Sequence, residues 1–107
     1  MEIIGRSQIK EMVAMEGKSL VGKTFGQLSI GRDELSAVQK EIWARAYEQE
    51  KIDICARKGY PDRAIRIAGA WVFSEEVSQE MVDKVAISMI QEIDEAVYEK
   101  KLRFRKS

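Results

Sequence analysis

The chain has 107 residues, which is enough for one domain, residues 1–107, with a single apolar core. Its eighteen basic and eighteen acidic residues cancel, so no overall field attracts nucleic acid or an anionic membrane. There is no histidine and one cysteine, which excludes histidine-based nucleophile pairs, histidine-containing zinc sites and internal disulfides. We therefore expect a non-enzymatic, cytoplasmic protein without catalytic residues, metal, cofactor or membrane-spanning segment.

The first predicted helix runs from Ser7 to Glu16. Ser7 is a favourable N-cap, and Ile9, Met12 and Val13 recur at helical spacing. Gly17 follows and is expected to end the helix.

Residues 17–24 read Gly-Lys-Ser-Leu-Val-Gly-Lys-Thr and match the GxxxxGKT pattern of a P-loop. In a P-loop the glycines let the backbone wrap a phosphate, so Gly22, Lys23 and Thr24 would form a phosphate site. That site needs a buried strand before it and a helix after it. Here a helix is predicted before it, and two glycines in residues 25–31 predict a loop or short strand after it. We interpret the segment as a glycine-rich connector and keep a minimal nucleotide binder as an alternative function.

The middle of the chain supports two interpretations. A helix is predicted from Asp33 to about Glu50, and after it the apolar residues alternate with polar ones at 52–56 and again at 65–67. Residues 58–62, Lys-Gly-Tyr-Pro-Asp, are typical of a turn. This predicts a β-hairpin and an α+β fold. In the alternative, all-α fold, the helix continues to Arg57 and a short helix starts at Asp62.

The last predicted element is a long amphipathic helix from Ser74 to Lys101, with Ser74 as its N-cap. Its apolar positions cover an arc of roughly 180°, against the roughly 100° of a helix with one buried face. We expect the excess to be covered by a second copy of the chain or by another protein. The predicted interface residues are Trp71, Phe73, Val82, Ala86, Ile90 and Val97.

A short run also carries a family resemblance. Residues 63–77, Arg-Ala-Ile-Arg-Ile-Ala-Gly-Ala-Trp-Val-Phe-Ser-Glu-Glu-Val, place a predicted strand before Ser-Glu-Glu and a long helix. This run, under a third of the chain, resembles the segment that joins a strand to the spine helix in major capsid proteins of tailed phages. The resemblance implies an assembly role, as a structural or accessory protein of a phage or mobile element.

Basic residues gather at the predicted turn and at the C-terminal end. With Tyr60 available to stack on a base, they predict an alternative function as a nucleic-acid-binding regulator. Its candidate phosphate contacts are Arg57, Lys58, Arg63, Arg66, Arg103 and Arg105. The neutral total charge favours the alternative that these residues form a solvated turn in a charge-rich protein.

Overall fold

The computed structural model describes residues 5–106, and the side chains of residues 5–95. The described chain consists of α-helices and two short 3-10 turns. The helices are α1 (Arg6–Lys18), α2 (Phe25–Ile30), α3 (Ala37–Lys58), α4 (Ile65–Val72) and α5 (Gln79–Lys106), with η1 (Arg32–Glu34) and η2 (Asp62–Ala64) between them. Within residues 5–106 the β-structure is limited to one isolated bridge, Thr24–Glu76. The predicted α+β fold is therefore wrong, and the all-α alternative describes the architecture.

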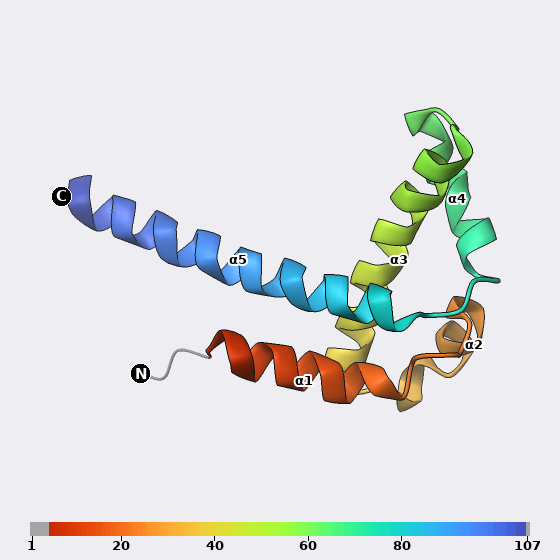
Figure 1. Ribbon diagram of the computed structural model, residues 1–107, viewed down its shortest axis with the longest axis horizontal. Helices are drawn as coiled ribbons and strands as arrows, with labels where there is room; N and C mark the ends of the chain where they lie inside the picture. Colours follow the sequence, from red (N-terminus) through yellow and green to blue (C-terminus); the bar gives the residue numbers. More distant parts are fainter. Residues whose placement is uncertain (1–4, 107) are drawn as a thin grey trace.

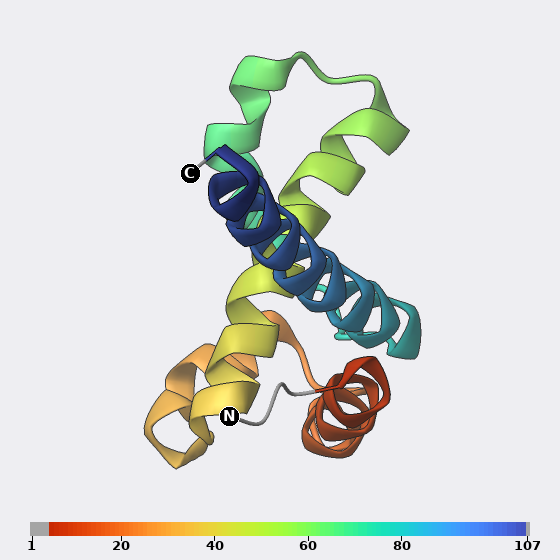
Figure 2. The same ribbon diagram turned by 90° about the vertical axis from the view of Figure 1, so that its left-hand side faces the viewer.

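The helices form two pairs that meet at the middle of α3. Figure 1 shows α1 and α5 side by side and running in opposite directions, with α3 crossing behind them. Turned by 90°, Figure 2 shows α4 returning along the second half of α3 at one end of the molecule, and α2 at the other end. The most extensive contacts join α1 to α5 and α3 to α4.

The predicted hairpin is the end of α3, a turn and α4. Gly59 ends α3 in the left-handed conformation, φ 70°, and the Tyr60 amide donates to the Cys55 carbonyl at 2.9 Å. Ile54 and Cys55 are both buried, which helical packing allows and strand alternation does not. The strand that residues 63–77 needed for their resemblance to capsid proteins is absent, since the start of this run forms η2 and α4.

The N-terminal helix is longer than predicted. It continues through Gly17 to Lys18, and the residues after it begin a second helix, α2, where a loop or short strand was expected. Two capping boxes explain these boundaries: the side chains of Thr24 and Ser36 accept from the amides of Gln27 and Gln39, each at 3.1 Å. Asp33 lies in η1, so α3 starts later than predicted, after Ser36.

The link from α4 to α5 is held by main-chain hydrogen bonds to the link between α1 and α2. The Val77 amide donates to the Lys23 carbonyl at 2.8 Å, and the Gly22 amide donates to the Val77 carbonyl at 2.9 Å. These bonds keep residues 74–78 out of a helix, so α5 starts at Gln79 and the predicted Ser74 cap is wrong.

One core lies where the five helices meet, with side chains from α1, α2, α3, α4 and α5. Its largest fully buried side chains are Val13, Leu20, Phe25, Ile42, Val72, Val77 and Val82. Burying one such side chain contributes about 1.5–3 kcal/mol. None of the described helices combines the length and the apolar composition needed to cross a membrane.

Candidate interaction surfaces

The segment that matches the P-loop pattern begins inside a helix. Gly17 is buried in α1 against α5, and a Cβ at this position would lie 2.5 Å from Val82 Cγ1. Such a distance is far inside van der Waals contact, so the glycine allows the two helices to approach each other. The first glycine of the pattern therefore serves helix packing.

The other residues of the pattern have structural partners as well. Gly22 adopts φ 90° in the turn, and its amide donates to the Val77 carbonyl rather than facing an open cradle. The Thr24 hydroxyl caps α2. Lys23 is exposed, and no strand precedes it among the described residues. These three residues do not form the predicted phosphate site, because a P-loop needs free amides between a strand and a helix.

The predicted interface residues of α5 are divided between core and surface. Val82 and Ala86 are buried within the chain itself, and Ile90 is half-buried in the layer that packs on the core. Val97 lies beyond the residues whose side chains are described. The first half of the apolar arc is therefore covered mainly by α1 and α3, and only the free sides of α5 remain for a partner.

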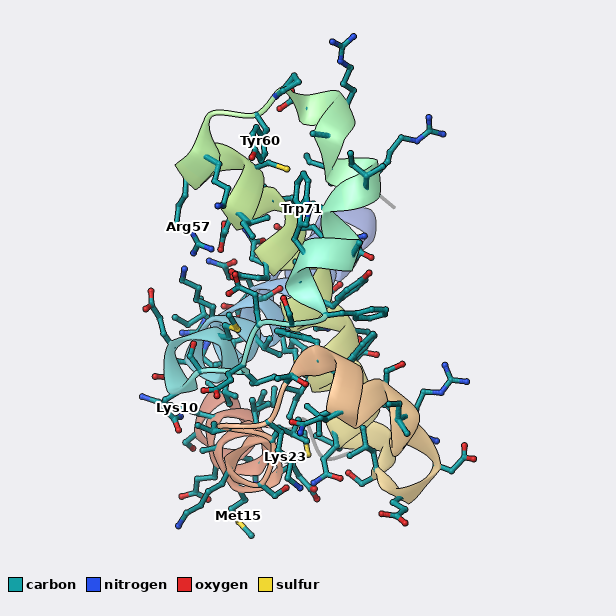
Figure 3. The ribbon with its side chains drawn as sticks, turned by 90° about the vertical axis from the view of Figure 1, so that its right-hand side faces the viewer. Lys10, Met15, Lys23, Arg57, Tyr60 and Trp71 are labelled. Atoms are coloured by element: carbon teal, nitrogen blue, oxygen red, sulfur yellow. The ribbon has the colours of Figure 1, made fainter. Side chains whose placement is uncertain are left out.

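Trp71 and Phe73 lie at the end of α4, among aromatic residues that the sequence separates widely. Phe73 stacks on Tyr47 with ring centroids 5.5 Å apart, and Tyr47 stacks on Trp43 at 4.9 Å. Trp71 contacts Tyr60 instead, at 5.3 Å. Figure 3 shows Tyr60 and Trp71 next to each other, far from Lys23 and Met15.

These two rings belong to an exposed apolar surface that we call the aromatic corner, defined as Tyr60, Ile67, Ala70 and Trp71. Tyr60 is 44 % exposed, Trp71 39 % and Ile67 63 %. Ile67, Ala70 and Trp71 share one face of α4, at three- and four-residue spacing. Exposed apolar surface of this kind marks an interaction site more often than a scattered single residue does.

A cavity of about 350 Å³ opens at the aromatic corner, and we call it the corner pocket. Tyr60, Trp71 and Ala70 line it from the side of the turn and α4, and Lys58 and Glu75 line it with side chains of opposite charge. Its size is near the lower end of ligand and side-chain pockets.

Arg57, which was a candidate phosphate contact, is engaged within the chain. Its guanidinium donates to Glu50 Oε2 at 3.1 Å. Glu50 is the buried acid of α3 and is only 3 % exposed. Its burial raises the pKa of its carboxyl, and the nearby carboxylate of Glu75 raises it further. Arg57 acts in the opposite direction and lowers the pKa of Glu50. Glu50 in turn raises the pKa of Arg57. Both residues of the pair belong to α3, and Glu50 also lies beside Glu75 of the link before α5.

Three of the remaining basic candidates lie on successive elements, at the end of α3, on η2 and on α4. Lys58, Arg63 and Arg66 are exposed, and the ion pairs found among the described residues do not involve them. Arg103 and Arg105 lie outside the residues whose side chains are described.

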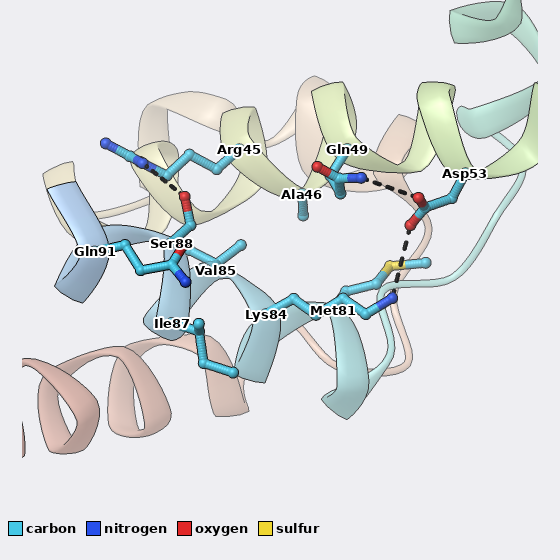
Figure 4. A pocket seen from close by; sticks show the side chains of 10 residues that line it. All are labelled: Arg45, Ala46, Gln49, Asp53, Met81, Lys84, Val85, Ile87, Ser88 and Gln91. Carbon is cyan, nitrogen blue, oxygen red and sulfur yellow. Dashed lines mark hydrogen bonds and ion pairs between the residues drawn. The ribbon is translucent and has the colours of Figure 1, made fainter.

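A second cavity, of about 310 Å³, lies between α3 and α5 (Figure 4). Its polar residues bond one another across it: Arg45 donates to Ser88 Oγ at 3.3 Å, and Lys84 lies 3.7 Å from Asp53. Arg45 also pairs with Glu41 and Glu92, and these partners raise its pKa against the opposing effect of burial. We interpret this groove as a structural contact that ties α3 to α5.

Sequence reasoning missed four features. Ile30 at the end of α2 is 91 % exposed, the highest fraction among the exposed large apolar side chains, and Ile67 was assigned to a strand. Glu50 was taken as the end of a helix, and only the structure buries it. The spacing Thr24-x-x-Gln27 and Ser36-x-x-Gln39 was a readable capping signal.

No cluster in the part of the chain with described side chains groups three or more residues able to hold a metal ion, and the thiol of Cys55 is buried. No protein-family model, curated protein or solved structure matches this chain.

Proposed function

We propose that the protein is a non-enzymatic assembly protein that associates with a second copy of itself through α5. The observation that carries this proposal is the length of α5. It has 28 residues against 13 in α1, and the ion pair between Arg6 at the start of α1 and Asp94 marks how far α1 accompanies it. Beyond that point α5 projects away from the other helices (Figure 1).

The charge distribution along α5 supports a second copy as the partner. Residues 79–95 contain five acidic residues and one basic residue, a net charge of −4. Residues 96–106 contain five basic residues and one acidic residue, a net charge of +4. When two copies of α5 lie antiparallel, the acidic part of each faces the basic part of the other, and a parallel pair places like charges together.

A side of α5 is available for such a partner. Exposed residues follow one another at three- and four-residue spacing on the side of α5 opposite its buried face: Glu80, Asp83, Ile87, Gln91 and Asp94, of which Asp94 pairs with Arg6 of α1. In the sequence the same spacing continues through Tyr98, Lys101 and Arg105. Both halves of this side combine an apolar residue with charges, as the seam of a helix pair does.

The proposal is tested by exchanging the charges of the two halves in separate variants. One variant carries Glu80→Lys and Asp83→Lys, and the other carries Lys101→Glu and Arg105→Glu. Exposed ion pairs contribute about 0.5 kcal/mol each. Losing about four of them weakens the dimer by roughly thirtyfold. We expect light scattering behind size exclusion to show a dimer for the wild type, monomers for each variant and a dimer for their equimolar mixture.

The control carries Lys10→Glu and Glu11→Lys, which exchange charges on the exposed surface of α1 and should leave the mass unchanged. A wild type that stays monomeric at high micromolar concentration contradicts the proposal. A mixture that stays monomeric contradicts the charge pairing.

Two other functions remain predictions. Nucleic-acid binding would use the basic residues around Tyr60, where Arg57 is already engaged by Glu50. A place in a phage or mobile-element particle has only the resemblance of residues 63–77 behind it, without the strand. Nucleotide binding loses its basis, because residues 17–24 join two helices.

A further inference from the structure

A second contact between copies is suggested by two features at opposite ends of the molecule. The first is Ile30, whose side chain is 91 % exposed at the end of α2. Asp33 and Glu34 follow it in η1, and both are exposed, as is Arg32. We call Ile30 with residues 32–34 the isoleucine tip.

The second feature is the corner pocket. Its open side is formed by the Tyr60 and Trp71 rings and by exposed Ala70. Lys58 and Glu75 line it with opposite charges. Asp62, Arg63 and Arg66 are exposed on η2 and α4, the elements that follow Tyr60 and lead to Ala70 and Trp71. Together these five charged residues carry a net charge of +1, whereas residues 32–34 of the isoleucine tip carry a net charge of −1.

We propose that the isoleucine tip of one copy docks into the corner pocket of another. A pocket of about 350 Å³ accommodates an isoleucine side chain with room to spare. Ile30 would then lie against the two aromatic rings, and Asp33 and Glu34 would lie on the side of Lys58, Arg63 and Arg66. Both the apolar fit and the sign of the charge point to the same occupant.

The positions of the two features determine the kind of assembly. Figure 2 shows α2 and the α3–α4 turn at opposite ends of the molecule. A contact between different surfaces leaves a free tip on one copy and a free pocket on the other, so further copies can add. The contact is small and is expected to be weak on its own. It does not require the pairing of α5, although two tips and two pockets on an α5 dimer would strengthen it by avidity.

Single-stranded nucleic acid is the competing occupant of the corner pocket, since bases also stack on aromatic rings near cations. Ile67 argues for protein, because an isoleucine that is 63 % exposed offers apolar contact but no stacking surface.

The test compares two variants, alone and mixed, by sedimentation velocity over a range of concentrations. Ile30→Asp removes the tip, and Ala70→Glu fills the pocket and repels the acidic tip; both positions are exposed, so both variants should fold. The weight-average sedimentation coefficient should rise with concentration for the wild type and stay flat for each variant, with the contact at least roughly tenfold weaker. Mixing the variants should restore part of the rise, because the intact tip of Ala70→Glu meets the intact pocket of Ile30→Asp.

The matched control is Met15→Asp, which removes an apolar side chain that is 77 % exposed elsewhere on the surface. The proposal is overturned if the wild type shows no rise beyond its α5-dependent mass, if Met15→Asp abolishes the rise, or if the mixture recovers nothing. An oligothymidylate that binds the wild type but not Ala70→Glu, without any protein association, would assign the pocket to nucleic acid. Measuring the α5 charge variants in parallel separates a failure of this contact from a failure of the α5 dimer.

Discussion

The contact between α1 and α5 and the contact between α3 and α4 each include a buried glycine, but the residues opposite the glycines differ. Opposite Gly17 is Val82, which is fully buried and has no space into which to move. Opposite Gly69 is the ring of Tyr47, whose Cζ would lie 3.0 Å from a Cβ at that position and whose hydroxyl would lie closer still. Tyr47 is only partly buried. The first contact is packed on all sides, and the second is open on one side.

This difference separates the stabilising part of the molecule from the part available to partners. The α1–α5 contact encloses its apolar residues, among them Val13 and Val82. The α3–α4 contact leaves Tyr60, Ile67 and Trp71 at the surface, although these residues could add to a core. A chain of this size gains from burying every large apolar side chain, so leaving three exposed at one corner favours a role for them in binding.

The largest expected effect is that of Gly17→Ala. The added methyl group collides with Val82 in a region without free volume, which costs about 3 kcal/mol, and the better helix propensity of alanine returns about 1 kcal/mol. We expect a net loss of about 2 kcal/mol in the free energy of unfolding, measured by urea denaturation followed by circular dichroism.

The double variant Gly17→Ala, Val82→Ala should recover part of this loss, because the shorter side chain leaves room for the methyl group. Gly31→Ala is the matched control, since a Cβ there would meet only the Gln27 carbonyl oxygen, at 3.8 Å. An unchanged stability for Gly17→Ala would show that α1 and α5 can separate freely, and the contrast between the two contacts would disappear.

A smaller effect is expected where Arg57 pairs with Glu50. Arg57→Ala leaves a buried carboxylate without its cation, and because Arg57 itself is half-exposed we expect a loss of about 1–2 kcal/mol at neutral pH. The pKa of Glu50 is already raised by burial and rises further in the variant. The folded state then binds the proton more tightly than the unfolded state does.

The sign of the pH dependence follows from this linkage. A raised carboxyl pKa in the folded state means that stability falls as the pH rises from the ordinary carboxyl value, 4.5, through the folded value. The defect of Arg57→Ala should therefore shrink at acidic pH, and Glu50→Gln should remove it at neutral pH. Denaturation curves at several pH values test this, and a defect that does not vary with pH would mean that Glu50 is not the cause.

The sequence predicted the helices better than it predicted what lies between them. The stripes around Val13 and Ile42 correctly indicated α1 and α3. The alternation at 52–56 and 65–67 indicated strands, because over so few residues two helices that each expose one large apolar side chain show the same pattern as strands. Ile52 and Ile67 are those residues. A short apolar run does not reveal whether its residues face a core or a partner.

Candidate surfaces were harder to predict, because they depend on contacts between distant segments. Trp71 could be named as an anchor, but its neighbour Tyr60 and the corner pocket require the turn after α3. Gly17 was interpreted as a helix stop because its partner, Val82, lies 65 positions further along the chain. The sequence shows that the apolar positions of α5 cover a wide arc, but it could not show that α1 and α3 cover much of this arc.

The smallest effect is expected for Gly69→Ala on the open contact. The new methyl group displaces the Tyr47 ring, which can turn toward solvent at a cost of about 1 kcal/mol, and the gain in helix propensity offsets about the same amount. We expect the free energy of unfolding to change by less than about 1 kcal/mol. The near-ultraviolet circular dichroism should change clearly, since the stacking of Tyr47 on Trp43 and Phe73 is altered. A loss as large as that of Gly17→Ala would show that the α3–α4 contact is packed as tightly as the α1–α5 contact, and the exposed aromatic side chains would then have to be explained by stability.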